Sequence, residues 1–279
     1  MAKGAQPKPR RPVSIAIVVP WFQAELTQDE RISLRHLAHF LGDYDTYIVA
    51  PTGLKSDSFC YQIRRFDERY FEDLLTYSRL MLSAEFYRQF SAYDYILVHQ
   101  LDCLVFSPDL SRWGDLGFDY IGAPWVRSDA SGRKRFTRVG NGGLSLRRVE
   151  SCLRVIEATG NGRSLLRSAK DLLFTELDDL GELAPAARWR KRLSMLRELN
   201  QGPEWYISRY SVHEDRFWSD RARLFFAGFK IPPVAVGLRF SFECEPRFCF
   251  EQAGRLLPFG CHGWAKQDRS FWEPYLLPA

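Results

Sequence analysis

The sequence predicts an α/β protein built on one central sheet of mixed, mostly parallel strands. Continuous apolar and β-branched runs such as VSIAIVVP at 13–20 are typical of strands that are buried on both faces of a sheet. Segments with helical spacing separate these runs, and strands that alternate with helices favour parallel pairing. The pattern GxGxxG does not follow the first strand, which argues against dinucleotide binding, and no P-loop pattern occurs.

The first half of the chain has the element order expected of this fold. Five elements are predicted: a strand at 13–20, a helix at 29–41, a strand at 44–51, a helix at 71–90 and a strand at 93–98. The first two strands end in proline, and Asp29 is a candidate N-cap for the first helix. This order gives the front half the form of a nucleotide-binding fold.

The second half is less regular than the first. Its predicted elements are short strands at 118–122 and 143–147, helices within 149–199, and short strands with aromatic loops at 234–242 and 256–264. No internal repeat and no later linker is visible. We therefore expect a disordered basic tail at 1–12 and a single domain over 13–279.

Composition and charge limit the classes of function. The 279 residues are 46% hydrophobic and 26% charged, which is ordinary for a globular protein. The net charge of +5 is spread along the chain, so no nucleic-acid partner is expected. No stretch approaches the roughly 18 apolar residues of a spanning helix. Six cysteines without CxxC spacing are typical of reduced thiols in a cytoplasmic protein.

A carboxylate interrupts the apolar stretch YILVHQLDCLVF at 95–106. Asp102 follows the run from Ile96 to Val98, where this strand is expected to end. Ligands of open α/β sheets bind beyond the carboxyl ends of strands, so Asp102 is a candidate ligand for a divalent cation that holds a diphosphate. The alternative is that Asp102 caps a turn before Leu104.

Three glycines surround an asparagine in VGNGGLSLR at 139–147. Glycine permits positive φ and close approach of a ligand to the backbone, so Asn141, Gly142 and Gly143 are candidate binding residues. Asn-Gly is also the strongest short hairpin signal, and a plain hairpin turn is the alternative. The local sequence favours neither.

Two further motifs contain titratable groups. HEDRFWS at 213–219 places Glu214 and Asp215 at the start of a helical pattern, where they are either favourable first-turn charges or a general base in a cleft. PFGCHGW at 258–264 places His262 between two glycines beside Trp264. Neutral imidazole is a good ligand for manganese-like ions, and the alternative is a histidine that only makes hydrogen bonds.

Taken in this order, the motifs resemble a glycosyltransferase of the GT-A fold. This resemblance implies that the irregular back half forms the acceptor side. The Asp-x-Asp metal motif of that fold corresponds to Gln100-Leu101-Asp102, with Gln100 in place of the first acid. The chain is similar to a bacterial and fungal family that carries a domain-of-unknown-function label and is assigned to glycosyltransferases. That family shares the motifs above and FDYIGAPW at 118–125, and the likeness spans about 13–270.

The resemblance implies transfer of a sugar from a nucleotide-diphosphate donor, with a UDP-sugar expected, to a glycan or lipid-linked glycan. Asp102 and His262 would bind manganese or magnesium, and Asp215 would be the base of an inverting reaction, with Glu214 as the alternative base. The other implied site residues are Pro20, Trp21, Arg79 and Gln100 for the nucleotide, and Trp125, Asn141, Gly142, Gly143 and Trp264 for the sugar and acceptor. Both tryptophans are alternatively core residues.

Two other classes of function stay open. A GT-A-like domain that binds a sugar nucleotide or glycan without turnover would keep some of these motifs, and Gln100 slightly favours it. The joint presence of a metal ligand and a base favours the enzyme. The basic run at 188–192 suits a peripheral membrane or RNA-binding protein, or it brings a transferase to the inner membrane, where lipid-linked glycans are built.

Overall fold

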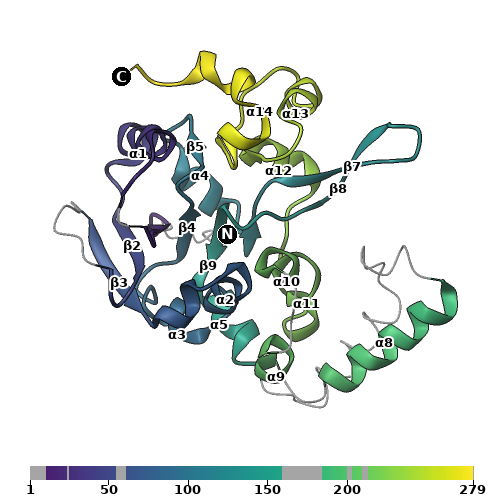
Figure 1. The fold of residues 1–279 in the computed structure, drawn as a ribbon. Helices are drawn as coiled ribbons and strands as arrows, with labels where there is room; N and C mark the ends of the chain where they lie inside the picture. Colours follow the sequence, from purple (N-terminus) through teal and green to yellow (C-terminus); the bar gives the residue numbers. More distant parts are fainter. Residues whose placement is uncertain are drawn as a thin grey trace, which may run out of the picture.

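The computed structural model describes residues 11–23, 25–54, 61–158, 184–199, 203–208 and 213–278 (Figure 1). Residues 1–10 of the predicted tail lie outside the described part. The central sheet has the strand order β3-β2-β1-β4-β9-β6. Its strands are β1 (Ile15–Pro20), β2 (Thr46–Pro51), β3 (Gln62–Phe66), β4 (Tyr95–His99), β6 (Tyr120–Ile121) and β9 (Leu144–Arg148).

The predicted mixed and mostly parallel sheet is confirmed. Strands β3, β2, β1 and β4 pair in parallel, and β9 runs antiparallel between β4 and β6. Because side chains of a strand alternate between faces, Ala16 and Val18 enter one core cluster whereas Ile15 and Ile17 enter the other. Both faces of the strand are thus buried, which explains its continuous apolar sequence.

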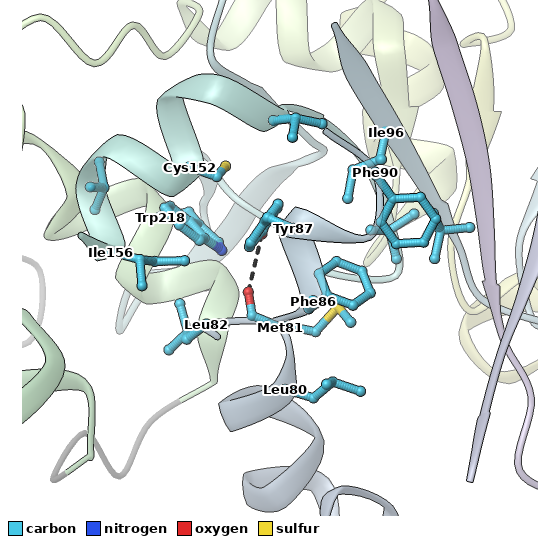
Figure 2. Packing of buried hydrophobic residues seen from close by; sticks show 14 of the residues in the cluster. Leu80, Met81, Leu82, Phe86, Tyr87, Phe90, Ile96, Cys152, Ile156 and Trp218 are labelled. Atoms are coloured by element: carbon cyan, nitrogen blue, oxygen red, sulfur yellow. Dashed lines mark hydrogen bonds between the residues drawn. The ribbon is translucent and has the colours of Figure 1, made fainter. Parts of the chain in front are cut away.

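Helices cover both faces of this sheet. One face packs against α2 (Leu74–Leu80), α3 (Ala84–Arg88), α5 (Val149–Ile156) and α10 (Glu214–Asp220), and the other packs against α1 (Gln28–Leu41) and α4 (Leu110–Asp115). Figure 2 shows the first cluster, in which the Tyr87 ring lies beside Trp218 and its hydroxyl donates to the Met81 carbonyl oxygen at 3.1 Å. The Tyr87–Trp218 contact therefore packs α10 against α3 on this face of the sheet.

Two helix predictions in the first half are wrong in detail. The segment predicted as one helix at 71–90 is broken, because the Ser83 hydroxyl accepts a hydrogen bond from the Phe86 amide at 3.1 Å and begins α3 as a new helix. A 3₁₀ turn, η1 (Glu68–Phe71), precedes α2. The N-cap of α1 is Thr27, which forms a capping box with Glu30, and Asp29 lies in the first turn.

The second half forms two small sheets and several short helices. A three-stranded sheet joins β5 (Leu104–Val105), β10 (Ser241–Phe242) and β11 (Gly260–Cys261), and β7 (Pro124–Ser128) pairs with β8 (Lys134–Val139) as a hairpin that the sequence did not reveal. The remaining elements are α8 (Pro185–Leu199), α9 (Pro203–Ser208), α11 (Ala222–Phe225), α12 (Val234–Phe240), α13 (Pro246–Gln252), α14 (Trp264–Trp272) and η2 (Glu273–Tyr275).

The strand prediction at 234–242 is wrong for most of its length. Residues 234–240 form α12, which buries Leu238 and Phe240, and only the last two residues are a strand. Pro233 precedes this helix, in a position where a missing amide hydrogen costs nothing. A short apolar run does not distinguish a buried helix from a strand by its periodicity, which accounts for the error.

The last described residues return to α1. The buried His36 ring contacts the Val105 carbonyl oxygen through Nδ1 at 3.0 Å and accepts a hydrogen bond from the Leu277 amide through Nε2 at 3.0 Å. The Arg35 guanidinium donates to the Pro278 carbonyl oxygen at 2.7 Å. None of the described helices has the length and apolarity needed to cross a membrane.

Candidate active site

The carboxyl ends of β1 and β4 open into a pocket of about 440 Å³. Binding at this edge is expected of an open α/β sheet. Pro20, Gln100 and Asp102 line the pocket as the sequence predicts. The other lining residues are Phe22, Gln23, Glu30, Phe71, Glu72, Asp73, Leu74, Tyr77 and Leu101. Asp102 lies in the turn between β4 and β5, past the end of the strand.

The structure brings Asp102 and His262 together, although 160 positions separate them in the chain. The His262 Nε2 atom lies 3.3 Å from Asp102 Oδ1 and 3.1 Å from Gln100 Oε1. The side chain of Asp102 is half-exposed, yet its Oδ1 atom is buried and makes no hydrogen bond with a described residue. The turn-cap alternative therefore does not account for this oxygen.

A second carboxylate, which the sequence did not single out, contacts the other side of the imidazole. Glu243 Oε1 lies 3.2 Å from His262 Nδ1, and both side chains are largely buried. Burial alone would lower the pKa of His262, but the negative charges of Asp102 and Glu243, which face its two ring nitrogens, raise that pKa to about 10. The sequence signal for Glu243 is its place directly after β10, like that of Asp102 after β4.

The asparagine and glycines at 140–143 form the junction of the site. They do not make a β8–β9 hairpin, since β8 pairs with β7 and β9 pairs with β4 and β6. The positive φ of 78° belongs to Asn141, whose Oδ1 accepts a hydrogen bond from the Leu144 amide at 3.0 Å. Its Nδ2 atom lies 3.0 Å from His262 Nδ1.

Close approach explains the glycines of this loop. A Cβ atom would lie 2.0 Å from the Trp125 ring at position 140, 2.3 Å from Glu214 Oε1 at position 142, and 2.2 Å from His262 Cδ2 at position 143. The groups that approach the backbone at these glycines are thus three side chains of the protein itself and not a ligand. Two adjacent residues of the loop therefore contact different parts of the site: Gly142 packs against the Glu214 carboxylate of α10, and Gly143 packs against the His262 imidazole.

Glu214 is committed to a buried ion pair. Its Oε1 atom accepts a hydrogen bond from the Arg147 guanidinium at 3.0 Å, and Oε2 accepts one from the Ser78 hydroxyl at 3.3 Å. Arg147 is completely buried and also donates to the Gly142 carbonyl oxygen at 3.3 Å. A buried guanidinium needs such a partner, so Glu214 fixes α10 to the glycine loop and is poorly placed as a base.

Asp215, the next residue of α10, has the properties of a general base. Its Oδ1 atom accepts a hydrogen bond from the Arg216 amide at 2.7 Å, and the side chain is half-buried. Burial, with the nearby Glu214 carboxylate, raises the pKa of Asp215 to about 7. A carboxylate with a pKa near the working pH is well suited to accept a proton from a hydroxyl group.

Three of the predicted binding residues lie elsewhere. Trp21 is buried in the core and its indole nitrogen donates to the Gln23 carbonyl oxygen at 2.8 Å, so that Phe22 lines the pocket instead. Arg79 is exposed and lines a different pocket, beside α3 and α5. Trp264 is completely buried among the residues of α13 and α14, which is the core alternative.

Trp125 remains next to the site. It is half-buried, lies against Gly140, and has the Arg216 guanidinium over its ring at 5.6 Å from the centroid.

Asp102 and His262 fit two ligands of a divalent cation. The unpartnered buried Oδ1 atom and the facing Nε2 atom are a hard oxygen and an imidazole nitrogen, the donor types that manganese accepts. Among the described residues no group of three or more His, Cys, Asp or Glu side chains forms a metal cluster. Further ligands would have to come from water or from a bound diphosphate, as is common for magnesium-type sites.

Comparison with known proteins assigns the family. The sequence profile described as "Protein of unknown function (DUF5672)" matches residues 60–262, more than half of the chain. The chain belongs to this family. The match includes the motifs at 95–106, 118–125, 139–147 and 213–219 and extends through His262, so the predicted family resemblance is confirmed. No curated protein matches this DUF5672 member.

Solved structures similar to this DUF5672 protein include glycosyltransferases. A glycosyltransferase involved in glycosylation of the major capsid of PBCV-1 is 10% identical with a TM-score of 0.44, and covers 94% of this chain and 98% of its own. The galactosyltransferase LgtC, in complex with donor and acceptor sugar analogues, is 12% identical with a TM-score of 0.46, and covers 95% of this chain and 97% of its own. The bifunctional IspDF from Campylobacter jejuni is 8% identical with a TM-score of 0.32, and covers 52% and 44%.

Proposed function

We propose that this protein transfers a sugar from a nucleotide-diphosphate donor to a glycan or lipid-linked glycan, with inversion and with a divalent cation. One observation carries the proposal. Asp102 and His262 meet at the carboxyl end of β4, and the glycine loop that contacts His262 also contacts the helix that bears Asp215. Residues 141–143 thus contact both the candidate metal ligand His262 and the helix that carries the candidate base.

The pocket at the ends of β1 and β4 suits the donor. Phe22, Phe71 and Leu74 supply apolar wall for a base and ribose, and we propose uridine as the base. Four carboxylates line the pocket, at Glu30, Glu72, Asp73 and Asp102, and no Lys or Arg does so among its described lining. A diphosphate entering this pocket therefore needs a cation to offset the negative charge, which supports metal dependence.

The residues of the chain divide the work of transfer. When bound at Asp102 and His262, manganese or magnesium neutralises charge on the departing diphosphate. Asp215 accepts the proton of the acceptor hydroxyl as its oxygen bonds to the anomeric carbon and the bond from that carbon to the β-phosphate oxygen breaks. Nucleoside diphosphate leaves with the electron pair of that bond. Single displacement inverts the configuration at the anomeric carbon.

The basic run at 188–192 supports a proposed membrane contact for lipid-linked acceptors. It lies in α8, where Trp189 and Leu193 are each about half-exposed. Cationic side chains with exposed apolar ones suit an anionic membrane surface. Figure 1 shows α8 at the periphery, well away from β4.

Two substitutions test the proposal. Asp102→Ala should abolish the rise in melting temperature that a UDP-sugar with manganese produces, and Asp215→Asn should keep that rise and lose transfer, by about 100-fold or more for a missing general base. Asp43→Ala, which removes an exposed carboxylate, is the control.

The transfer rate of the wild type should fall as pH drops below about 7, because Asp215 then gains a proton.

The outcomes separate the candidate functions. Donor binding without detectable transfer in the wild type would favour the domain that binds without turnover. Normal transfer by Asp215→Asn would show that another group is the base. Absence of any nucleotide-dependent rise in melting temperature, with a panel of nucleotide sugars and manganese, would overturn the proposed function.

A further inference from the structure

The guanidinium of Arg216, which pairs with no carboxylate in the described part of the chain, belongs to the residue next to the candidate base. Arg216 follows Asp215 on α10 and is half-buried. Its guanidinium carbon lies over the Trp125 ring, 5.6 Å from the centroid. Among the described residues no carboxylate pairs with this guanidinium, whereas Arg138 on the neighbouring β8 pairs with Asp220 at 2.7 Å. A half-buried cation without an anionic partner is costly unless a ligand supplies one.

The Arg216–Trp125 pair is held in place by the glycine loop. The indole packs against the backbone of Gly140, where even a methyl group would lie 2.0 Å from the ring. An arginine stacked on an aromatic ring keeps the N–H donors on its edge free for a carboxylate or phosphate. The pair is therefore a rigid cationic platform on the Asp215 side of the site.

The hairpin that carries Trp125 is itself basic. Residues 124–139 contain Arg127, Arg133, Lys134, Arg135 and Arg138 against a single acid, Asp129. Ion pairs with Asp129, Glu245 and Asp220 offset part of this charge. Figure 1 shows the β7–β8 hairpin extending from the body of the molecule. A basic projection next to the platform would attract an anionic ligand over a distance of about 8 Å at physiological salt.

We propose that the acceptor carries an anionic group, a carboxylate or a phosphate, which binds the Arg216–Trp125 pair. The inference rests on the proposed function and specifies its acceptor. The donor pocket is negatively charged, whereas the Arg216–Trp125 pair is positively charged. Carboxylates line the donor pocket and repel an acidic acceptor, while Arg216 attracts it and holds its hydroxyl near Asp215. An anionic acceptor is thus expected to bind with its charged group at Arg216 and away from the donor pocket.

The test compares three probes of similar size: glucose, glucuronate and glucose 6-phosphate. Binding is measured at fixed ionic strength by the NMR signal of the Trp125 indole N–H, assigned with Trp125→Phe. We expect at least one anionic probe to bind about tenfold tighter than glucose, as a charge-assisted hydrogen bond allows. The glucuronate and glucose 6-phosphate arms distinguish a carboxylate from a phosphate acceptor.

Substitutions at Arg216 complete the test. In Arg216→Gln the anionic probes should bind with about the same affinity as glucose. Arg216→Lys should keep part of the preference for the anionic probes, because lysine retains the charge but lacks the planar guanidinium. Arg255→Gln removes the same charge from an exposed residue paired with Glu251 and should leave the preference unchanged. Equal binding of the three probes to the wild type, or an equal loss in Arg255→Gln, would overturn the inference.

Donor binding is measured separately on each variant, by the melting-temperature rise with UDP-sugar and manganese. If the wild type shows this rise but no anionic preference, only the acceptor assignment fails. If the rise itself is absent, the proposed function fails with it. Arg216→Lys retains the cation on the ring, so it serves as the folded variant if Arg216→Gln is unstable.

Discussion

At the scale of single residues, His262 depends on the carboxylate behind it. Contact with Glu243 on Nδ1 orients the ring so that Nε2 faces Asp102. Because the pKa of His262 is raised to about 10, a cation bound at Nε2 would replace the proton on that nitrogen. A carboxylate that contacts the other ring nitrogen sets the orientation and basicity of a metal-binding histidine. Glu243 is therefore a positioning residue for the proposed metal site.

Glu243→Gln should weaken manganese binding by about 10- to 100-fold, the usual range for loss of such a partner. Titration with manganese followed by electron paramagnetic resonance measures the affinity without any need for activity. Glu245→Gln, two positions away and exposed, should bind manganese like the wild type. An unchanged affinity in Glu243→Gln would remove the residue from the site.

Individual residues show what the sequence could and could not predict. Asp102 and His262 lie in motifs with a distinctive order, and the structure places them side by side. Trp264 lies in an equally distinctive motif and Trp21 directly follows the first strand, but both are core residues, because burial depends on packing partners far away in the sequence. Glu243 lies outside these motifs, and Arg216 lies inside the one at 213–219 without a predicted role, so only their three-dimensional neighbours reveal a role.

At the scale of elements, the loop at 140–143 joins three parts of the structure that the chain itself keeps apart. The loop connects β8 to β9, and its three glycines contact side chains from β7, α10 and the residue after β11. Packing this close leaves no room for adjustment. The order of these three contacts aligns the proposed acceptor, base and metal positions.

Gly143→Ala should therefore displace His262 and eliminate the manganese-dependent rise in melting temperature. Overpacking of a full interior also lowers the free energy of unfolding, by about 1 to 3 kcal/mol. Gly132→Asn, in the β7–β8 turn, should keep the manganese response, because there is open space around its Cβ position and asparagine adopts a positive φ, here 81°, more readily than most residues. Thermal unfolding with and without manganese checks the prediction, and a normal manganese response in Gly143→Ala would contradict it.

Elements of the first half were easier to predict than those of the second. The strands at 13–20 and 93–98 are buried on both faces, so their composition alone identifies them. The break between α2 and α3 and the helix α12 depend on capping by Ser83 and on tertiary packing, neither of which changes the hydrophobic period. The β7–β8 hairpin is mostly half-exposed and lacks a continuous apolar run.

At the scale of the whole molecule, two buried histidines link stability to pH. Burial lowers the pKa of His36, and it lowers the pKa of His99 to about 4. His99 is then neutral in the folded state at pH 6, and His36 binds protons less readily than it does in the unfolded chain, where histidines have a pKa near 6.5. Their contribution to stability is complete above about pH 6.5 and declines as pH falls further. His262, whose pKa is raised, acts in the opposite direction.

Comparison of variants isolates His36. The free energy of unfolding lost in His36→Gln should be smaller at pH 5.5 than at pH 7.5, by up to about 1 kcal/mol, the value of one pH unit below the pKa of the unfolded histidine. Urea unfolding at the two pH values measures this difference. His39→Gln, at an exposed position on the same helix, should show no such change. An equal loss at both pH values would contradict the linkage.

The Asp102–His262 contact has a consequence for how the protein is recovered from a denatured state. The pairing joins chain positions more than half the length of the sequence apart, and Asn141, which contacts His262 across 121 positions of the chain, adds a third. Such long-range pairings are completed late, after local helices and hairpins have formed. Regained affinity for manganese would thus report arrival at the native topology, and would lag behind any far-ultraviolet signal during renaturation.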